Sequence, residues 1–92
     1  MDKRRIKVTV RGLVQGVSFR AAARGQAKAL GVTGWVRNQP DGSVLLEAQG
    51  PVVSVERMLA WCRVGPPVAE VSGVDVQDLP VLDGEGDFAI RH

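Results

Sequence analysis

The sequence predicts an α+β fold, a single domain over residues 1–92 in which an antiparallel sheet is covered on one face by two helices. Three observations predict it. A chain of 92 residues forms one hydrophobic core and no second one. Strand-like and helix-like segments follow one another in the order βαββαβ, and a short strand-like segment comes after them. Hydrophobic residues make up 45% of the chain, which suffices for a sizeable core.

The first strand is predicted at residues 6–10 (IKVTV), where apolar and polar side chains alternate with the period of a strand buried on one face. The next two strands are predicted at residues 32–38 (VTGWVRN) and 43–49 (SVLLEAQ). Between them, residues 39–42 (QPDG) combine proline with Asp-Gly, which favours a hairpin turn.

The first helix is predicted from an apolar stripe with steps of four, four and three residues. The stripe consists of Phe19, Ala23, Ala27 and Leu30. Ser18 is in position to cap this helix, and Gly31 is in position to end it. The second helix is predicted to open at Gly50 and Pro51, with the proline in its first turn, and to end at residues 65–67 (GPP). Its apolar face consists of Val55, Met58, Leu59 and Cys62.

A fourth strand is predicted at residues 68–76 (VAEVSGVDV) and a short terminal strand at residues 87–92 (DFAIRH). The complete order is that of the ferredoxin-like βαββαβ sandwich with a short terminal strand. That fold hosts many functions, so the function has to be inferred from the site.

Composition excludes several classes of protein. Cys62 is the only cysteine, so no disulfide framework is expected, and its apolar neighbours indicate a buried, inert thiol. The N-terminus lacks a signal-peptide pattern and no apolar run reaches the length of a membrane span. We therefore expect a cytoplasmic protein without a membrane partner. A monomer is expected because neither predicted helix has an exposed apolar face.

Charge is spread unevenly along the chain. The net charge is +2, but the first 40 residues contain nine Lys and Arg residues and one acid, Asp2. Such asymmetry suits a small anionic ligand in the first half of the chain. The basic residues from Lys3 to Arg5 are interpreted differently, as a solvated strand end that blocks aggregation.

The segment GLVQGVSFR (residues 12–20) connects the first strand to the first helix through two glycines. Unpaired amides at a helix N-terminus form an anion site, and Gly16 permits the positive φ angles that turn successive amides inward. Arg20 adds a planar fork that matches two phosphate oxygens, and residues 12–24 contain no carboxylate. A simple turn followed by a surface arginine explains the loop alone equally well. The anion site gains support from Asn38, at the end of the strand expected to lie near the loop.

Four segments together resemble the acylphosphatases: GLVQGVSFR, LGVTGWVRNQPDGSV, QGP and FAIR. The resemblance covers nearly the whole chain, with the segments in the order and spacing of that family. It implies the ferredoxin-like fold and hydrolysis of the carboxyl-phosphate bond without a metal or other cofactor. The expected ligands are an acyl phosphate and inorganic phosphate.

The resemblance also implies roles for single residues. Arg20 matches the phosphate-binding arginine of the family, and Asn38 matches the asparagine that holds the attacking water. The phosphate cradle is implied to consist of the backbone amides of Gln15, Gly16, Val17, Ser18 and Phe19. Phe19 and Trp35 also match family positions, but both are interpreted as core residues.

The residues agree with that chemistry. An acyl phosphate expels a carboxylate whose pKa is about 4, so no general acid is needed. Phosphoryl transfer depends mostly on positioning and charge stabilisation, which Arg20, the amides and a water held by Asn38 supply. His92, the only histidine, stands at the end of the sequence, and no cluster has metal-ligand spacing.

Some positions depart from the family pattern. Arg20 is followed by Ala21, Ala22 and Ala23, where bulkier residues and a threonine at Ala23 are expected. The small side chains either widen the floor of the site or remove a hydroxyl that supports it. Gln39 replaces a threonine or an apolar residue. Ser18, often a glycine, is interpreted as the helix cap.

Other functions remain as alternatives, chiefly a non-catalytic module that binds an anion or a small molecule. A sensor domain of the amino-acid-binding type belongs here. A separate alternative is the acylphosphatase-like module of hydrogenase-maturation proteins, which serves carbamoyl phosphate chemistry. An RNA-binding module is not expected, because residues 6–10 and 43–49 contain no aromatic side chain on which a base could stack. A final hypothesis is that the terminal carboxylate approaches Arg20.

Overall fold

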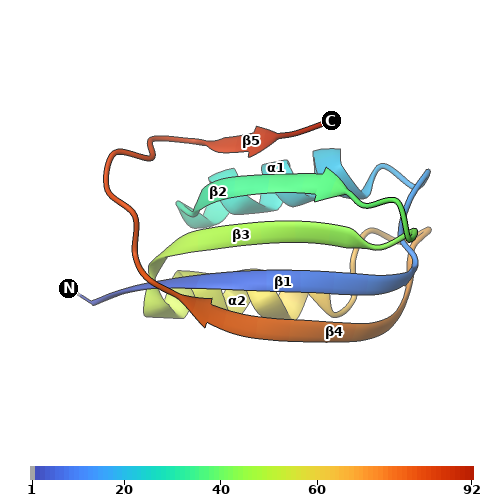
Figure 1. Cartoon of the computed structure of the whole chain (residues 1–92), viewed down its shortest axis with the longest axis horizontal. Helices are drawn as coiled ribbons and strands as arrows, with labels where there is room; N and C mark the ends of the chain where they lie inside the picture. Colours follow the sequence, from blue (N-terminus) through green and yellow to red (C-terminus); the bar gives the residue numbers. More distant parts are fainter. Residues whose placement is uncertain (1) are drawn as a thin grey trace.

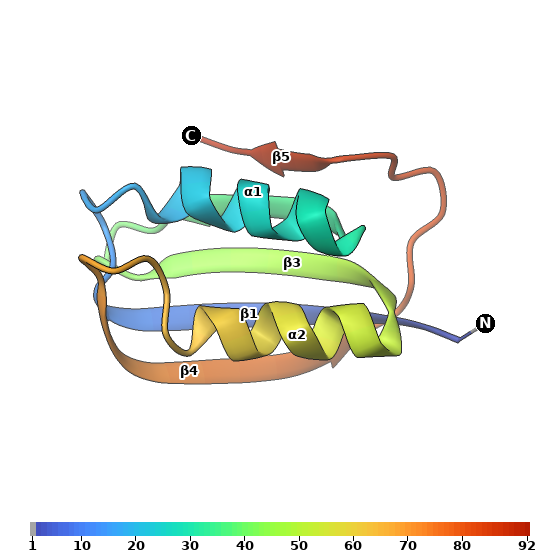
Figure 2. The ribbon, with the colours of Figure 1, turned by 180° about the vertical axis from the view of Figure 1, so that it is seen from behind.

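The computed structural model describes residues 2–92 and contains five strands and two helices. In chain order these are β1 (Lys3–Leu13), α1 (Phe19–Leu30), β2 (Thr33–Asn38), β3 (Val44–Pro51), α2 (Val52–Cys62), β4 (Glu70–Leu79) and β5 (Phe88–Ile90). Both helices cover the same face of one sheet, as the predicted sandwich requires (Figure 2). No helix in residues 2–92 is long and apolar enough to cross a membrane.

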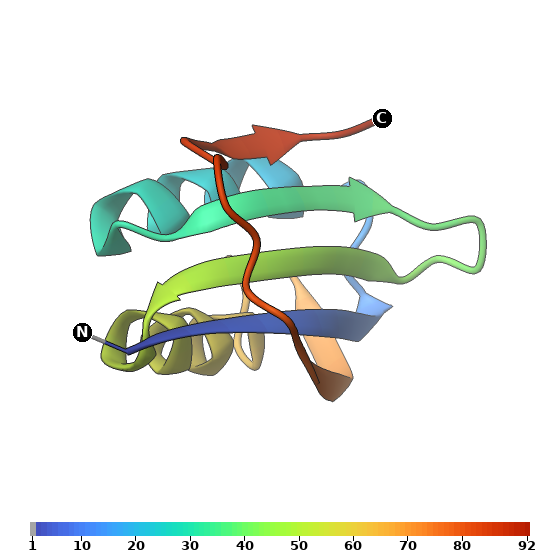
Figure 3. The same ribbon diagram turned by 60° about the vertical axis from the view of Figure 1, so that its left-hand side comes forward.

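The strands are arranged in the order β4-β1-β3-β2-β5 (Figure 1). The four longer strands pair antiparallel, as predicted, whereas β5 pairs parallel to β2 and makes the sheet mixed. The reason is the path of residues 80–87, which cross from β4 at one edge to β5 at the other (Figure 3). The chain therefore enters β5 in the same direction as β2.

The hydrophobic core lies between the sheet and the helices, and it confirms the apolar patterns of the sequence. The alternate residues Ile6, Val8 and Val10 of β1 are fully buried. The buried residues of the helices are Phe19, Ala23 and Ala27 of α1 and Val55, Met58 and Cys62 of α2. Burial raises the pKa of the Cys62 thiol to about 12, so that side chain is an inert part of the core.

Two helix starts differ from the prediction, whereas the end of α1 agrees with it. Gly31 ends α1 with a φ of 71° and donates its N–H to Lys28. Pro51 is the last residue of β3 and precedes the first turn of α2. Ser18 occupies the N-cap position of α1, but its φ is 60° and its side chain makes no capping hydrogen bond. The predicted Ser18 cap is therefore wrong, because a left-handed backbone does not aim the hydroxyl at the helix amides.

Trp35 is buried, but not in the core where it was predicted. Its neighbour Val36 is part of the core, so the alternation of β2 directs Trp35 to the opposite, open face of the sheet. There the guanidinium carbons of Arg37 and Arg91 lie 5.4 and 4.5 Å from the centre of the Trp35 ring. The tryptophan is covered by two cations instead of by a helix.

Arg5 is also buried, and the prediction of a solvated strand end is wrong at this position. Its side chain is 1% exposed on the open face of the sheet. Its guanidinium donates hydrogen bonds to Glu47 (2.9 Å), Gln49 (3.2 Å) and Glu85 (2.9 and 3.3 Å). The Gln49 side chain in turn exchanges two 2.8 Å hydrogen bonds with the backbone of Leu82. These contacts attach residues 80–87 to the sheet.

Candidate active site

The loop between β1 and α1 leaves the sheet at a β-bulge. The register of β1 against β4 shifts between Arg11 and Gly12, where the φ of Gly12 is 122°. A Cβ at this position would collide with the carbonyl oxygen of Glu70, so the close approach of the two strands requires glycine. Farther along, Gly16 has the positive φ of 75° that the sequence predicted, and Ser18 is left-handed as well.

The loop amides are unpaired within the described chain. None of the N–H groups of residues 15–19 donates a hydrogen bond to another group in residues 2–92, and the first helical bond joins the Ala22 N–H to the Ser18 carbonyl (3.1 Å). Two left-handed residues within three positions fold these amides into a concave turn at the N-terminus of α1. Such a turn is suited to an anion because it offers donors and the positive end of the helix dipole together.

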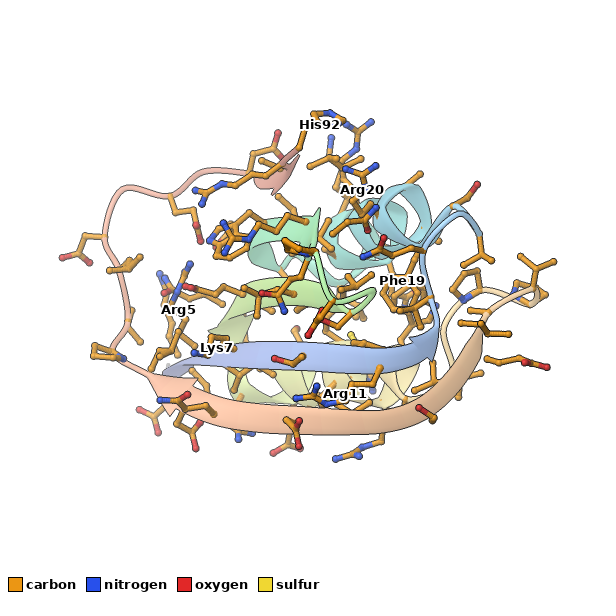
Figure 4. The ribbon with its side chains drawn as sticks, turned by 45° about the vertical axis from the view of Figure 1, so that its right-hand side comes forward. Arg5, Lys7, Arg11, Phe19, Arg20 and His92 are labelled. Carbon is orange, nitrogen blue, oxygen red and sulfur yellow. The ribbon has the colours of Figure 1, made fainter. Side chains whose placement is uncertain are left out.

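Arg20 extends from the first turn of α1 toward the segment that follows β5 (Figure 4). Its Nη1 donates to the Arg91 carbonyl at 3.0 Å and lies 3.2 Å from Nδ1 of His92. Nε and Nη2 have no acceptor within residues 2–92, so one edge of the guanidinium fork is available to a ligand. The terminal residues therefore do reach Arg20, but through a carbonyl and an imidazole. The ion pairs of residues 2–92 do not include one between Arg20 and the terminal carboxylate.

Asn38 is the last residue of β2 and is half-buried. Its side-chain amide forms no hydrogen bond with another group in the described residues, so it too is available to a ligand or a water. Gln15 holds the strand end that carries Asn38. The Gln15 amide donates to the carbonyls of Gln39 (2.7 Å) and Ser43 (2.8 Å), and thereby joins the loop to the β2–β3 hairpin.

The hairpin itself is held by several short hydrogen bonds, as its Asp-Gly signal predicted. The Gln39 N–H donates to the Ser43 carbonyl (2.9 Å), and the Gly42 N–H donates to the Gln39 carbonyl (3.1 Å). Asp41 accepts hydrogen bonds from the Ser43 hydroxyl (2.6 Å) and N–H (2.9 Å). These bonds, that from the hydroxyl foremost, lower the pKa of Asp41. Asn38 is thus attached to a rigid turn.

One cavity of about 240 Å³ lies at this end of the molecule and joins the predicted residues. It is formed by the loop, the first turn of α1, the end of β2 and the chain around β5. The lining residues are Val14, Gly16, Ser18, Phe19, Arg20, Ala21, Asn38, Ile90 and His92. Gln15 and Val17 do not line it: the Gln15 side chain faces the hairpin, and Val17 is packed against the core.

The alanines after Arg20 have different roles. Ala21 lines the cavity. Ala23 is fully buried in the core and does not line the cavity, because position 23 belongs to the apolar stripe of α1. Gln39 contacts the hairpin: its side chain donates to the Ser43 hydroxyl at 2.9 Å.

Sequence reasoning missed Ile90 and His92 as parts of the cavity, and it missed the Gln15 side chain as a clamp. No local signal could reveal the first two, since their position depends on the parallel pairing of β5 with β2. Gln15 offered a weak signal, because an amide side chain in a glycine loop has two donors to place.

Comparisons with known proteins agree with this arrangement. The sequence model of the Acylphosphatase family matches residues 6–90. An acylphosphatase of Methylococcus capsulatus is 52% identical over 87 residues, which cover 95% of each chain. The structure of an acylphosphatase from Coxiella burnetii superposes with a TM-score of 0.91 at 41% identity, covering 98% of this chain and 94% of the other. That of Bacillus subtilis gives 0.92 at 30% identity, covering 97% and 99%. The chain therefore belongs to the acylphosphatase family, the hydrolases of acyl phosphates.

Proposed function

We propose that this chain cleaves acyl phosphates in the cavity between the loop and β5, with Arg20 and the loop amides holding the phosphate and Asn38 orienting the water. One observation supports the proposal above all others. Three residues with unpaired amides (Gly16, Ser18 and Phe19), Arg20 with its free edge and Asn38 with its unpaired amide line a single cavity of about 240 Å³. Each of these groups has hydrogen-bonding capacity left for a ligand or a water that enters the cavity.

The reaction follows from the placement of these groups. The water oxygen attacks phosphorus while the bond between phosphorus and the acyl oxygen breaks, and the electron pair of that bond leaves with the carboxylate. A carboxylate needs no proton to leave, so the site requires no general acid. The proton of the attacking water passes to a phosphate oxygen, and inorganic phosphate results.

The protein supplies positioning and charge. The fork of Arg20 and the amides of residues 15–19 neutralise the phosphoryl oxygens, whose charge persists in a loose transition state. Asn38 holds the water opposite the leaving oxygen, and the Gln15 clamp fixes the strand end that presents it. We assign the charge stabilisation to these groups without a metal, since the cavity lining contains no Asp or Glu side chain.

The alternative function is binding without turnover, in which the same cavity retains an anion as a signal or a cargo. The unpaired Asn38 amide favours hydrolysis over this alternative. A phosphate-binding module has no need for a water-orienting group in addition to the loop and Arg20.

The test is hydrolysis of benzoyl phosphate in the presence of EDTA by the wild type and three variants. Arg20→Ala is expected to lower kcat/KM by about 1,000-fold, and Asn38→Ala to lower kcat by about 100-fold or more. Arg24→Ala is the matched control, because Arg24 is an exposed arginine one helical turn later and does not line the cavity. It is expected to retain activity within about twofold, since solvent and salt screen its charge.

Each outcome is informative. A wild type that binds phosphate through Arg20 but does not turn over would establish the alternative function. Loss of activity on adding EDTA would contradict the metal-free mechanism. A fall as large in Arg24→Ala as in Arg20→Ala would show that only general basic charge matters.

A further inference from the structure

We propose that His92 is a positioning residue for Arg20: its neutral imidazole accepts a hydrogen bond from the guanidinium and so directs the free edge of Arg20 at the substrate phosphate. The inference rests on the proposed function, because it concerns the residue assigned to the phosphate. His92 itself is assigned no contact with the reacting atoms.

The geometry pairs the His92 ring with one nitrogen of the Arg20 guanidinium. Nη1 of Arg20 lies 3.2 Å from Nδ1 of His92 and 3.0 Å from the Arg91 carbonyl oxygen, so both acceptors contact the same corner of the guanidinium. A guanidinium only donates, and Nδ1 must therefore be the unprotonated nitrogen of the ring. With Nη1 fixed at two points, Nε and Nη2 face away from the terminal segment and remain free for two phosphate oxygens.

The segment that presents His92 is anchored independently of the ring. The Arg91 N–H donates to the Val36 carbonyl at 2.8 Å, which continues the pairing of β5 with β2. On the open face, the Arg91 guanidinium lies 4.5 Å from the centre of the Trp35 ring. Substitution of the His92 side chain therefore leaves the backbone contact with Arg20 in place, and the contribution of the imidazole is measurable alone.

The charges around His92 decide what its protonation does. From α1, Arg20 faces the ring, and Arg24 is one turn farther along the same helix; Arg91 precedes it on the terminal segment. The loop and the end of β2 contribute no charged residue to the cavity lining, and Asp87, at the other end of β5, is occupied by Lys28 at 3.8 Å. Protonation therefore removes the acceptor and adds a cation beside Arg20.

The proposal predicts that phosphate binding depends on the protonation of the His92 ring. When the ring is neutral it accepts a hydrogen bond from Arg20 and the fork is fixed. When the ring is protonated the two cations repel each other and Arg20 samples other rotamers, which weakens phosphate binding. The effect is modest because the contact is exposed to solvent.

The first experiment measures KM for benzoyl phosphate and the inhibition constant of inorganic phosphate from pH 5 to 8.5 for wild type, His92→Ala and His92→Asn. The asparagine variant supplies an acceptor near the position of Nδ1 that does not titrate. At each pH, each constant of the wild type is divided by that of His92→Asn, and this ratio cancels the titration of the substrate itself.

At pH 8.5, His92→Ala is expected to raise both constants about 2- to 10-fold, while His92→Asn stays within about twofold of wild type. Once the ring is protonated, the wild type is expected to resemble His92→Ala, and His92→Asn to bind better than either. Two results would overturn the proposal. One is a ratio that does not change with pH. The other is tighter binding by the wild type at low pH, which would make the protonated ring a direct ligand of the anion.

A second readout does not depend on activity. His92 is the only histidine, so its ring nitrogens are unambiguous in ¹⁵N NMR of the whole protein. We expect the tautomer protonated on Nε2, with an Nδ1 shift that moves when Arg20 is replaced by alanine. An Nδ1 shift unaffected by Arg20→Ala would refute the contact. An inactive wild type that shows this coupling would refute the proposed function and leave the contact intact, so the two failures are distinguishable.

Discussion

Arg5 and Arg20 stand at opposite ends of the molecule and use the same guanidinium in opposite ways (Figure 4). Arg5 is almost completely buried, and each of its three nitrogens donates to a side-chain acceptor. Arg20 is half-buried, and only one of its nitrogens has an acceptor within the described residues. The number of satisfied donors, and not the type of residue, separates the two.

The difference teaches where stability and chemistry are located in this fold. A fully paired polar group in a sheet face fixes the structure and has nothing left to offer a ligand. An unpaired group at an open cavity is hydrated when no ligand is bound, so it contributes little to stability and remains available to a ligand. The Arg5 end is therefore expected to determine folding, and the Arg20 end to determine catalysis.

The largest effect on stability is expected for Arg5→Met. It leaves Glu47 and Glu85 without their counter-charge on a mostly covered face and should lower the free energy of unfolding by about 2–3 kcal/mol. Urea denaturation measures the loss, and kcat of the folded variant should equal that of the wild type. Arg4→Met is the matched control, since the Arg4–Asp78 pair is exposed and worth at most about 0.5 kcal/mol. Equal losses in the two variants would contradict the role assigned to Arg5.

Substitution of Gln15 should affect both stability and catalysis, each by an intermediate amount. Gln15→Ala removes two hydrogen bonds to the hairpin and is expected to cost about 1 kcal/mol of stability. It should also lower kcat about tenfold, because Asn38 is held less firmly. Gln15→Glu has the same size but presents oxygens to two carbonyls, so it should be worse than alanine in both assays. A glutamate variant as active as wild type would argue against the clamp.

The dependence of stability on pH gives a further test of the contacts around Arg5. Burial acts to raise the pKa of Glu85, but its hydrogen bonds, foremost with Arg5, outweigh burial and lower the pKa below its ordinary value of 4.5. A lowered pKa means stabilisation that is complete above the unfolded value and is lost as the pH falls through the folded value. Glu85→Gln should therefore be less stable than wild type by about 1 kcal/mol at pH 7, with the gap closing below about pH 4.5. A gap that does not narrow at all as the pH falls below about 4.5 would show that the loss is not electrostatic.

The smallest effect is expected at Ser18, within the loop. A non-glycine residue with a φ of 60° pays a steric cost, and the Ser18 side chain makes no capping bond that would offset it. Ser18→Gly should raise the free energy of unfolding by about 0.5 kcal/mol with little change in KM. Circular dichroism and the benzoyl phosphate assay together check this. A tenfold rise in KM would instead assign the hydroxyl to the phosphate.

These contrasts also explain which features the sequence could predict. The alternation at Ile6, Val8 and Val10 and the stripe of α1 depend on local periodicity, and the structure confirms both. The positive φ of Gly16 followed from the freedom of glycine alone. Arg20 and Asn38 could be named because short motifs surround them, and the fold brings both to one cavity.

The misses share a physical reason. Arg5 and Trp35 were misplaced because the open face of the sheet is covered by a segment from the far end of the sequence, and local patterns contain no information on that contact. The parallel direction of β5 and the presence of His92 in the cavity depend on the same long crossing. Contacts between residues more than 40 positions apart decided each of these cases.

The shortness of β5 has a consequence for how the molecule responds to heat. Three residues at the edge of a sheet form a short unit, and only Phe88 of β5 belongs to the buried core, whereas β1, β2 and β3 each contribute several buried residues. Fraying of the residues after Phe88 would withdraw the Arg91 carbonyl and the His92 ring from Arg20 while Phe88 remains in the core. Catalysis should then decline on warming at temperatures where the far-ultraviolet spectrum is still native. The three-residue edge strand would then determine the temperature at which activity begins to fall, below the temperature at which the fold melts.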